Sequence, residues 1–112
     1  MLSGRNNLQN DLITFKTASK SDWWFHVKNV PGSHTVMICN GEEPGERDFT
    51  EAAIIAAVNS SVPESKHVAV DYTQIKNIKK PAGAAPGFVV YYTNYSAYVD
   101  KDAAIAEKLK TD

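Results

Sequence analysis

Hydrophobic and polar residues alternate in two segments near the start of the chain, and this period of two is typical of β-strands. The segments are residues 12–17 and 23–28, and residues 19–22 between them have the composition of a turn, so we predict a hairpin. The strand pattern resumes over residues 35–39. Residues 1–11 are polar and rich in amides that compete for backbone hydrogen bonds, and we expect a loop there.

A helix is predicted over residues 48–59. Asp48 followed by Glu51 has the spacing of a capping box, with Asp in the place of the usual Ser or Thr. The residues that follow are apolar on almost every side, which is typical of a helix buried against a sheet. The longest mostly apolar run, residues 52–58, is far shorter than the roughly 20 residues that span a bilayer. The N-terminus lacks a charged-then-apolar signal pattern, so we expect a cytoplasmic protein.

The second half of the chain predicts further short strands and a terminal helix. The expected strands are residues 68–70, 74–78, 88–92 and 95–99, and the expected helix is residues 102–110. The last two strands would form a hairpin, and residues 71–73 a turn in which Asp71 accepts backbone amide hydrogen bonds. Because 112 residues suffice for one core, we predict a single α+β domain over residues 1–112. It would have a mostly antiparallel sheet, one main buried helix and a short C-terminal helix.

The strand predicted at residues 23–28 divides its side chains between two faces, because alternate residues of a strand point in opposite directions. The face expected to point inward consists of Trp23, Phe25 and Val27. The face expected to point outward consists of Trp24, His26 and Lys28. An aromatic ring, an imidazole and a cation in one row fit a nucleotide base and its phosphate. The alternative is that Trp24 covers a second, minor core and His26 is a satisfied edge residue.

The turn at residues 31–34 is a further candidate site. Its rigid proline and permissive Gly32 would let backbone amides approach a phosphate, although many ordinary turns look the same. Catalysis by His26 or His34 would need a nucleophile or a carboxylate pair that the spacing does not supply. Those histidines and Cys39 also lack the spacing of a metal site. We therefore predict no catalytic centre, no metal and no cofactor.

The net charge of −1 is unusual for a nucleic-acid-binding domain. Five acidic residues against one arginine give residues 42–51 a charge of −4, whereas residues 1–41 and 52–99 each carry +2. Cations can therefore gather on a face away from the acidic loop. Lys79 and Lys80 precede a stiff Pro/Gly loop at residues 81–87, which would hold them at a surface edge, where lysines usually form only a solvated face.

Six short motifs, in order along residues 3–99, resemble those of the NFACT-R domain. They are Gly4-Arg5-Asn6-Asn7 with Gln9-Asn10-Asp11, Asp22 to Lys28, Pro31-Gly32-Ser33-His34, the Glu51 to Ala57 helix, Val70 to Thr73, and Lys79 to Gly87. The domain usually forms the C-terminal part of a larger protein, after an NFACT-N domain, a helix-hairpin-helix and a coiled coil. The resemblance implies binding to transfer RNA and the large ribosomal subunit, in quality control of stalled translation.

The resemblance also implies which residues face RNA. They are Arg5, Asn6, Asn7, Gln9, Asn10, Trp24, His26, Lys28, Gly32, Ser33 and His34, to which the lysine pair adds Lys79 and Lys80. The chain departs from the family where relatives commonly have Lys-x-Arg after the helix, here residues 61–63, and a lysine in the Pro/Gly loop, here Ala85. The loss of up to three cations predicts weaker binding to RNA and a modest dependence on salt.

We therefore predict a non-catalytic RNA-binding module whose partners are tRNA, large-subunit rRNA, the large ribosomal subunit and the NFACT-N and coiled-coil parts of a larger protein. Some family members have been called fibronectin-binding proteins, so a protein-binding adhesion module is the alternative. The lack of an export signal and of paired cysteines argues against it. A small enzyme that uses His26 or His34 is a third reading.

Overall fold

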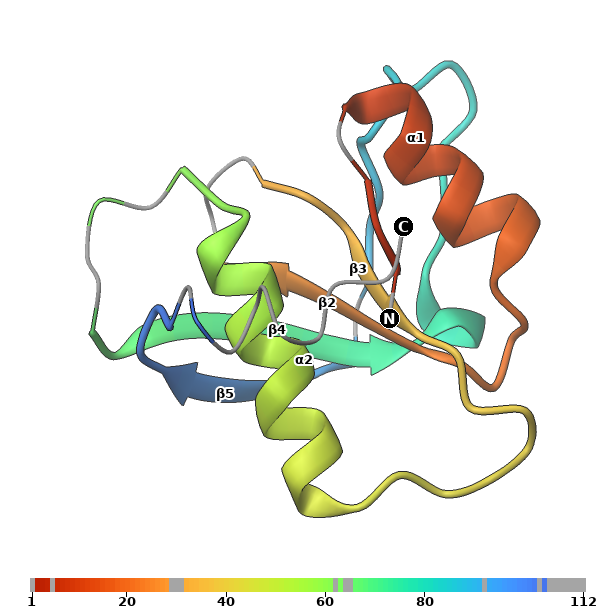
Figure 1. Ribbon diagram of the computed structural model, residues 1–112. Helices are drawn as coiled ribbons and strands as arrows, with labels where there is room; N and C mark the ends of the chain where they lie inside the picture. The colour runs from red at the N-terminus through yellow and green to blue at the C-terminus, as the bar shows by residue number, and fades with distance from the viewer. Residues whose placement is uncertain are drawn as a thin grey trace.

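An antiparallel sheet forms the centre of the computed structural model, which describes residues 2–4, 6–28, 32–61, 63, 66–91, 93–102 and 104. Within these residues the sheet has five strands in the order β1-β3-β2-β4-β5 (Figure 1). They are β1 (Leu2–Ser3), β2 (Trp23–Val27), β3 (Thr35–Met37), β4 (Val68–Gln74) and β5 (Tyr95–Val99). Every neighbouring pair is antiparallel. The predicted α+β fold is confirmed.

Helix α2 (Glu46–Val58) packs across one face of this sheet. Four alanines of the helix are completely or almost completely buried, and their small side chains let the helix approach β2 and β4 closely. Gly45 is the N-cap, and its amide donates to the Asp48 carboxylate at 2.9 Å. Asp48 is therefore the third helical residue and not the N-cap. The predicted helix is confirmed, but it starts earlier than expected.

The N-terminal region differs most from the prediction. Residues expected to form a loop and a strand form α1 (Asn7–Leu12), which continues as a π-helical turn (Ile13–Thr17). The Asn6 side chain accepts a hydrogen bond from the Gln9 amide at 2.9 Å and caps the helix. The predicted hairpin of residues 12–17 and 23–28 is therefore wrong, because the amide-rich segment uses its side chain to start a helix.

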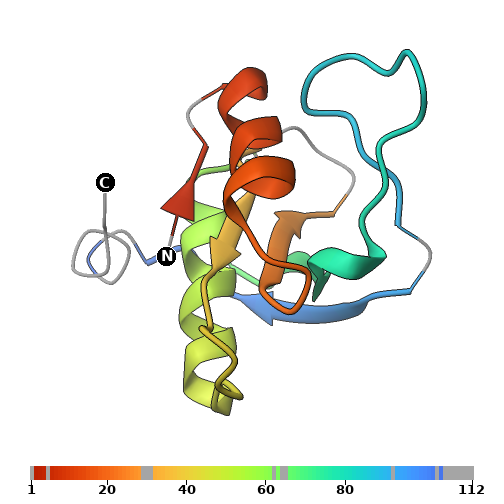
Figure 2. The same ribbon diagram turned by 90° about the vertical axis from the view of Figure 1, so that its right-hand side faces the viewer.

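A second apolar cluster lies on the sheet face opposite α2. Its buried residues are Trp24, Val36, Ile75 and Ile78, and partly buried residues of the π-helical turn and of segment 79–91 pack against them. Figure 2 shows α2 on one side of the sheet and segment 79–91 on the other. Trp24 is only 1% exposed, so the prediction that it is exposed is wrong, and the alternative of a second, minor core is correct.

Three smaller predictions also change. Strand β4 runs continuously through residues 71–73, where a turn was expected, and a 3-10 turn (Ile75–Asn77) replaces the next strand. Residues 88–91 form no regular strand, although Val90 and Lys79 form an isolated bridge. The predicted helix at 102–110 lies almost entirely outside the described residues. Among those that are described, no helix is long and apolar enough to cross a membrane.

Candidate nucleic-acid interface

Trp24, His26 and Lys28 lie in a row on one face of the second strand, and the Trp24 end of this row is buried. Trp24 stacks on His26, with ring centroids 5.5 Å apart and planes 6° from parallel, and it contacts His34 and Tyr91 edge-on. His34 Nδ1 lies 2.8 Å from the Thr14 hydroxyl, and both residues are completely or almost completely buried. The indole nitrogen of Trp24 has no hydrogen-bond partner among the described residues. This end of the row supports the fold, because no base can reach Trp24 in this conformation.

Burial also determines the protonation of the two histidines. It lowers the pKa of His34 to about 4, an effect that the nearby His26 strengthens and backbone hydrogen bonding at Gly87 partly offsets. Burial likewise lowers the pKa of His26, against the opposing effects of backbone hydrogen bonds and of the Asp71 charge. Both imidazoles are therefore neutral at pH 7 and contribute no positive charge to an RNA surface.

Asp71 contacts several side chains near the Lys28 end of this row. Its carboxylate accepts hydrogen bonds from the Tyr91 hydroxyl at 2.7 Å and from the Ser96 hydroxyl at 3.0 Å. Lys28 Nζ lies 3.9 Å from the same group, with half of its side chain exposed. Burial and the bond to Asp71 raise the pKa of Tyr91 well above its usual value, so the phenol keeps its proton. Lys28 is thus oriented but remains accessible. The expected turn role of Asp71 is replaced by bonds to side chains.

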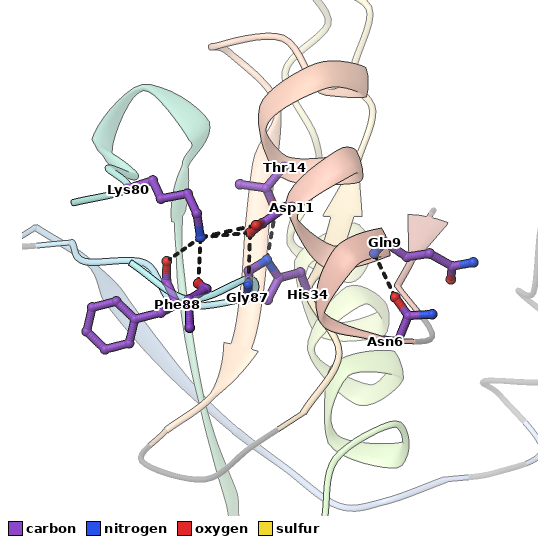
Figure 3. A network of polar contacts seen from close by, with 9 residues as sticks. Asn6, Gln9, Asp11, Thr14, His34, Lys80, Gly87 and Phe88 are labelled. Atoms are coloured by element: carbon purple, nitrogen blue, oxygen red, sulfur yellow. Dashed lines mark hydrogen bonds and ion pairs between the residues drawn. The ribbon is translucent and has the colours of Figure 1, made fainter. Parts of the chain in front are cut away.

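Lys80 holds the Pro/Gly loop to α1 (Figure 3). Its ammonium lies 3.1 Å from Asp11 Oδ2 and donates to the carbonyls of Ala85 and Phe88 at 2.8 and 3.1 Å. Asp11 Oδ1 also accepts the Gly87 amide at 3.0 Å. The ammonium of Lys80 is therefore engaged in structural contacts, whereas Lys79 is exposed. No local pattern could pair Asp11 with Lys80, because 69 positions separate them.

Backbone amides of the turn before β3 are hydrogen-bonded within the protein. Ser33 N donates to the Asn59 carbonyl at 3.4 Å, and His34 N donates to the Asn10 side chain at 3.0 Å. Gly32 forms a bridge with Ser60, two residues after α2 ends. Two of the amides expected to approach a phosphate are thus engaged within the protein, and the turn instead connects β3 to α1 and α2.

The N-terminal polar motif divides into two parts. The exposed residues are Asn6, Asn7 and Gln9. Asn10 is 3% exposed and holds His34, so its role is structural. Arg5 lies outside the described residues. Of the predicted RNA contacts, the exposed ones that the structure describes are therefore Asn6, Asn7, Gln9, Lys28 and Lys79.

The side chains of the candidate interface are poorly arranged for catalysis or metal binding. The Thr14–His34 contact joins a hydroxyl to an imidazole, but both side chains are shielded from a substrate. Within the described ranges, no group of three or more His, Cys, Asp or Glu side chains is placed to hold a metal ion. The accessible groups are amides and ammonium ions, which suit binding.

Gly87→Ala is expected to destabilise the protein by roughly 1–2 kcal/mol, because φ is +84° and an added Cβ would come 2.7 Å from the Asn7 side-chain oxygen. Gly83→Ala is a matched control, since φ is +76° there but no atom lies within 4 Å. Urea denaturation should therefore show a larger loss for Gly87→Ala. Equal losses would mean that only the backbone conformation matters and that contact with α1 does not.

Sequence comparison identifies the family to which this fold belongs. The family model of the NFACT protein RNA binding domain matches residues 1–93, so the chain belongs to this family. It is 46% identical over 110 residues to the Rqc2 homolog RqcH of Bacillus subtilis, covering 98% of this chain and 19% of that protein. It is 47% identical over 91 residues to the Rqc2 homolog RqcH of Streptococcus suis, covering 81% of this chain and 16% of that protein.

A solved structure shows the same fold. It is the C-terminal part of the fibronectin/fibrinogen-binding protein from Streptococcus suis, with a TM-score of 0.91 and 41% sequence identity. The match covers 98% of this chain and 44% of that one. The chain spans less than a fifth of the curated relatives named above. The predicted family is confirmed.

Proposed function

We propose that residues 1–112 form a non-catalytic RNA-binding module that acts in the cytoplasm on tRNA and the large ribosomal subunit, in quality control of stalled translation. The observation that carries this proposal is the family match over residues 1–93. The relatives named Rqc2 homolog RqcH support the context. The module would act together with NFACT-N and coiled-coil parts of a longer protein.

The contact surface would combine Lys28 and Lys79 with the exposed amides at the start of α1. Lysines neutralise phosphates and release counterions, and amides donate to phosphate and sugar oxygens. Lys28 is the strongest candidate, because its ion pair with Asp71 spans 3.9 Å and a closer phosphate would compete with it. Binding by so few cations predicts a shallow salt dependence.

Lys28→Ala is expected to weaken binding to tRNA and to purified large ribosomal subunits. Loss of one phosphate contact should also flatten the slope of log K against log salt by about 0.7–0.9. Lys16→Ala is the control, since Lys16 is also an exposed lysine and lies on the π-helical turn. Titrations between about 50 and 200 mM salt measure both quantities. An unchanged affinity and slope for Lys28→Ala would exclude this residue from the interface.

Adhesion is the second candidate, since the matching Streptococcus suis structure belongs to a protein described as binding fibronectin and fibrinogen. Immobilised fibronectin and tRNA can be compared directly with the same preparation of the chain. We expect saturable binding to tRNA and none to fibronectin. Saturable binding to fibronectin, with no binding to either tRNA or large subunits at low salt, would reverse the choice.

A further inference from the structure

Among the residues that the structure describes, none covers one half of the sheet face opposite α2. Segment 79–91 covers the other half, over Trp24, and reaches as far as Asp71 through Tyr91. Beyond Asp71, Tyr98 is 69% exposed, and Ala69 is partly exposed although it lies on a central strand. Val68 and Val70, which point to the α2 side of the same strand, are buried. The described part of the chain therefore leaves this half of the face accessible.

Strand register places three residues in one row across the open half. The Lys28 amide donates to the Ala69 carbonyl at 3.0 Å, directly after the pair Val27 and Val70. Ala69 is in turn paired with Tyr98. Neighbouring strands lie about 4.8 Å apart, so the backbones at Lys28 and Tyr98 are separated by about 10 Å. The row thus has an ammonium at one end, an aromatic ring at the other and only a methyl group between them.

The next row determines the polarity of this surface. It contains His26, Asp71 and Ser96, again paired by register. Asp71 is negative and already accepts two hydroxyl groups, while burial keeps His26 neutral. A phosphate is therefore repelled from Asp71 and attracted to the exposed end of Lys28. Between Lys28 and the exposed Tyr98 ring, Ala69 presents only a methyl group.

We propose that Lys28, Ala69 and Tyr98 form a platform for one unpaired nucleotide of single-stranded RNA. The base stacks on the Tyr98 ring above Ala69, and the Lys28 ammonium binds its phosphate. Bases inside a duplex are stacked on one another and present no free face to Tyr98, so the ligand is an unpaired nucleotide. This rests on the proposed RNA-binding function and adds the class of RNA. Tyr98 lies beyond the residues 1–93 that the family model matches.

The test compares a single-stranded RNA carrying 2-aminopurine with a blunt RNA duplex of the same length, using the 112-residue chain. Tyr98→Ala should weaken binding to the single strand by roughly 5- to 150-fold, with less than about a twofold effect on the duplex. It should also abolish the quenching of 2-aminopurine fluorescence that stacking on the Tyr98 ring causes. Tyr98→Phe should bind like the wild type, because the ring remains. Tyr95→Ala, which removes a comparably exposed tyrosine from the α2 side of β5, is the control.

Two outcomes would separate failure of the platform from failure of the wider function. If Tyr98→Ala binds the single strand and quenches as the wild type does, or if it loses both RNAs equally, the platform is wrong while RNA binding by the module stands. If the wild type binds neither these RNAs nor tRNA at low salt, the proposed function fails and the platform fails with it. Thermal melting of each variant confirms that the compared proteins are folded.

Discussion

Trp24→Ala is expected to lower the free energy of unfolding by roughly 3–5 kcal/mol, which is a large part of the stability of a domain of this size. The Trp24 side chain is 1% exposed and lies at the centre of the second apolar cluster. Its removal would leave a cavity between the sheet, the π-helical turn and segment 79–91. Urea denaturation followed by circular dichroism measures the loss.

Two further variants make the result specific to this tryptophan. Trp24→Phe should cost less, because it keeps an aromatic ring and removes an indole N–H that has no partner among the described residues. Trp23→Ala should also cost less, since Trp23 is only partly buried where it packs against Phe49 and Tyr72. A Trp24→Ala protein as stable as the wild type, or less affected than Trp23→Ala, would show that the second cluster contributes little.

Acidification is expected to destabilise the protein through His34. Burial lowers the pKa of His34 from its usual 6.5 to about 4, whereas the unfolded chain binds the proton near pH 6.5. The native state therefore has its full stability above pH 6.5 and loses it as the pH falls through 6.5 towards 4. The fall in pKa corresponds to about 3 kcal/mol over this interval. The lowered pKa of His26 adds to the loss in the same direction.

Stability at several pH values, compared between the wild type and His34→Gln, isolates this contribution. The variant cannot take up the proton, so its stability should fall less steeply between pH 6.5 and 4. Nuclear magnetic resonance of the wild type should show the His34 ring neutral at pH 5.5. A His34 ring that is protonated at that pH in the folded protein would contradict the prediction and mean that burial does not exclude water from the ring.

Strands β2, β3 and β5 were predictable because their alternation is local and because turn residues bound them. Helix α2 was predictable from its apolar run, although its capping box is formed by Gly45 and Asp48 and not by Asp48 and Glu51. The alternation at residues 12–17 was misleading: Ile13 and Phe15 pack against the second cluster from a π-helical turn. A period of two over so few residues does not exclude a helix, and the side-chain cap of Asn6 on Gln9 decides in its favour.

The roles of the candidate site residues were harder to predict than the strands. Lys80 was expected at a surface edge, but the fold brings it to Asp11 and engages both residues in holding the Pro/Gly loop. Asn10 and His34 were expected to contact RNA, and their hydrogen bond instead connects α1 to the start of β3. Such contacts depend on segments that are distant along the chain, and a local pattern carries no information about them.

By itself the sequence determined the family, the fold class and the division of β2 into two faces, because motif order and side-chain alternation are local properties of the chain. Side-chain alternation correctly places Trp23 and Trp24 on opposite faces of β2. It does not say what lies above each face. Only the tertiary structure decided that segment 79–91 and the π-helical turn bury Trp24, while Lys28 and Tyr98 remain accessible. The physical reason is that exposure depends on which distant segments pack over a residue, whereas direction depends only on the backbone of its own strand.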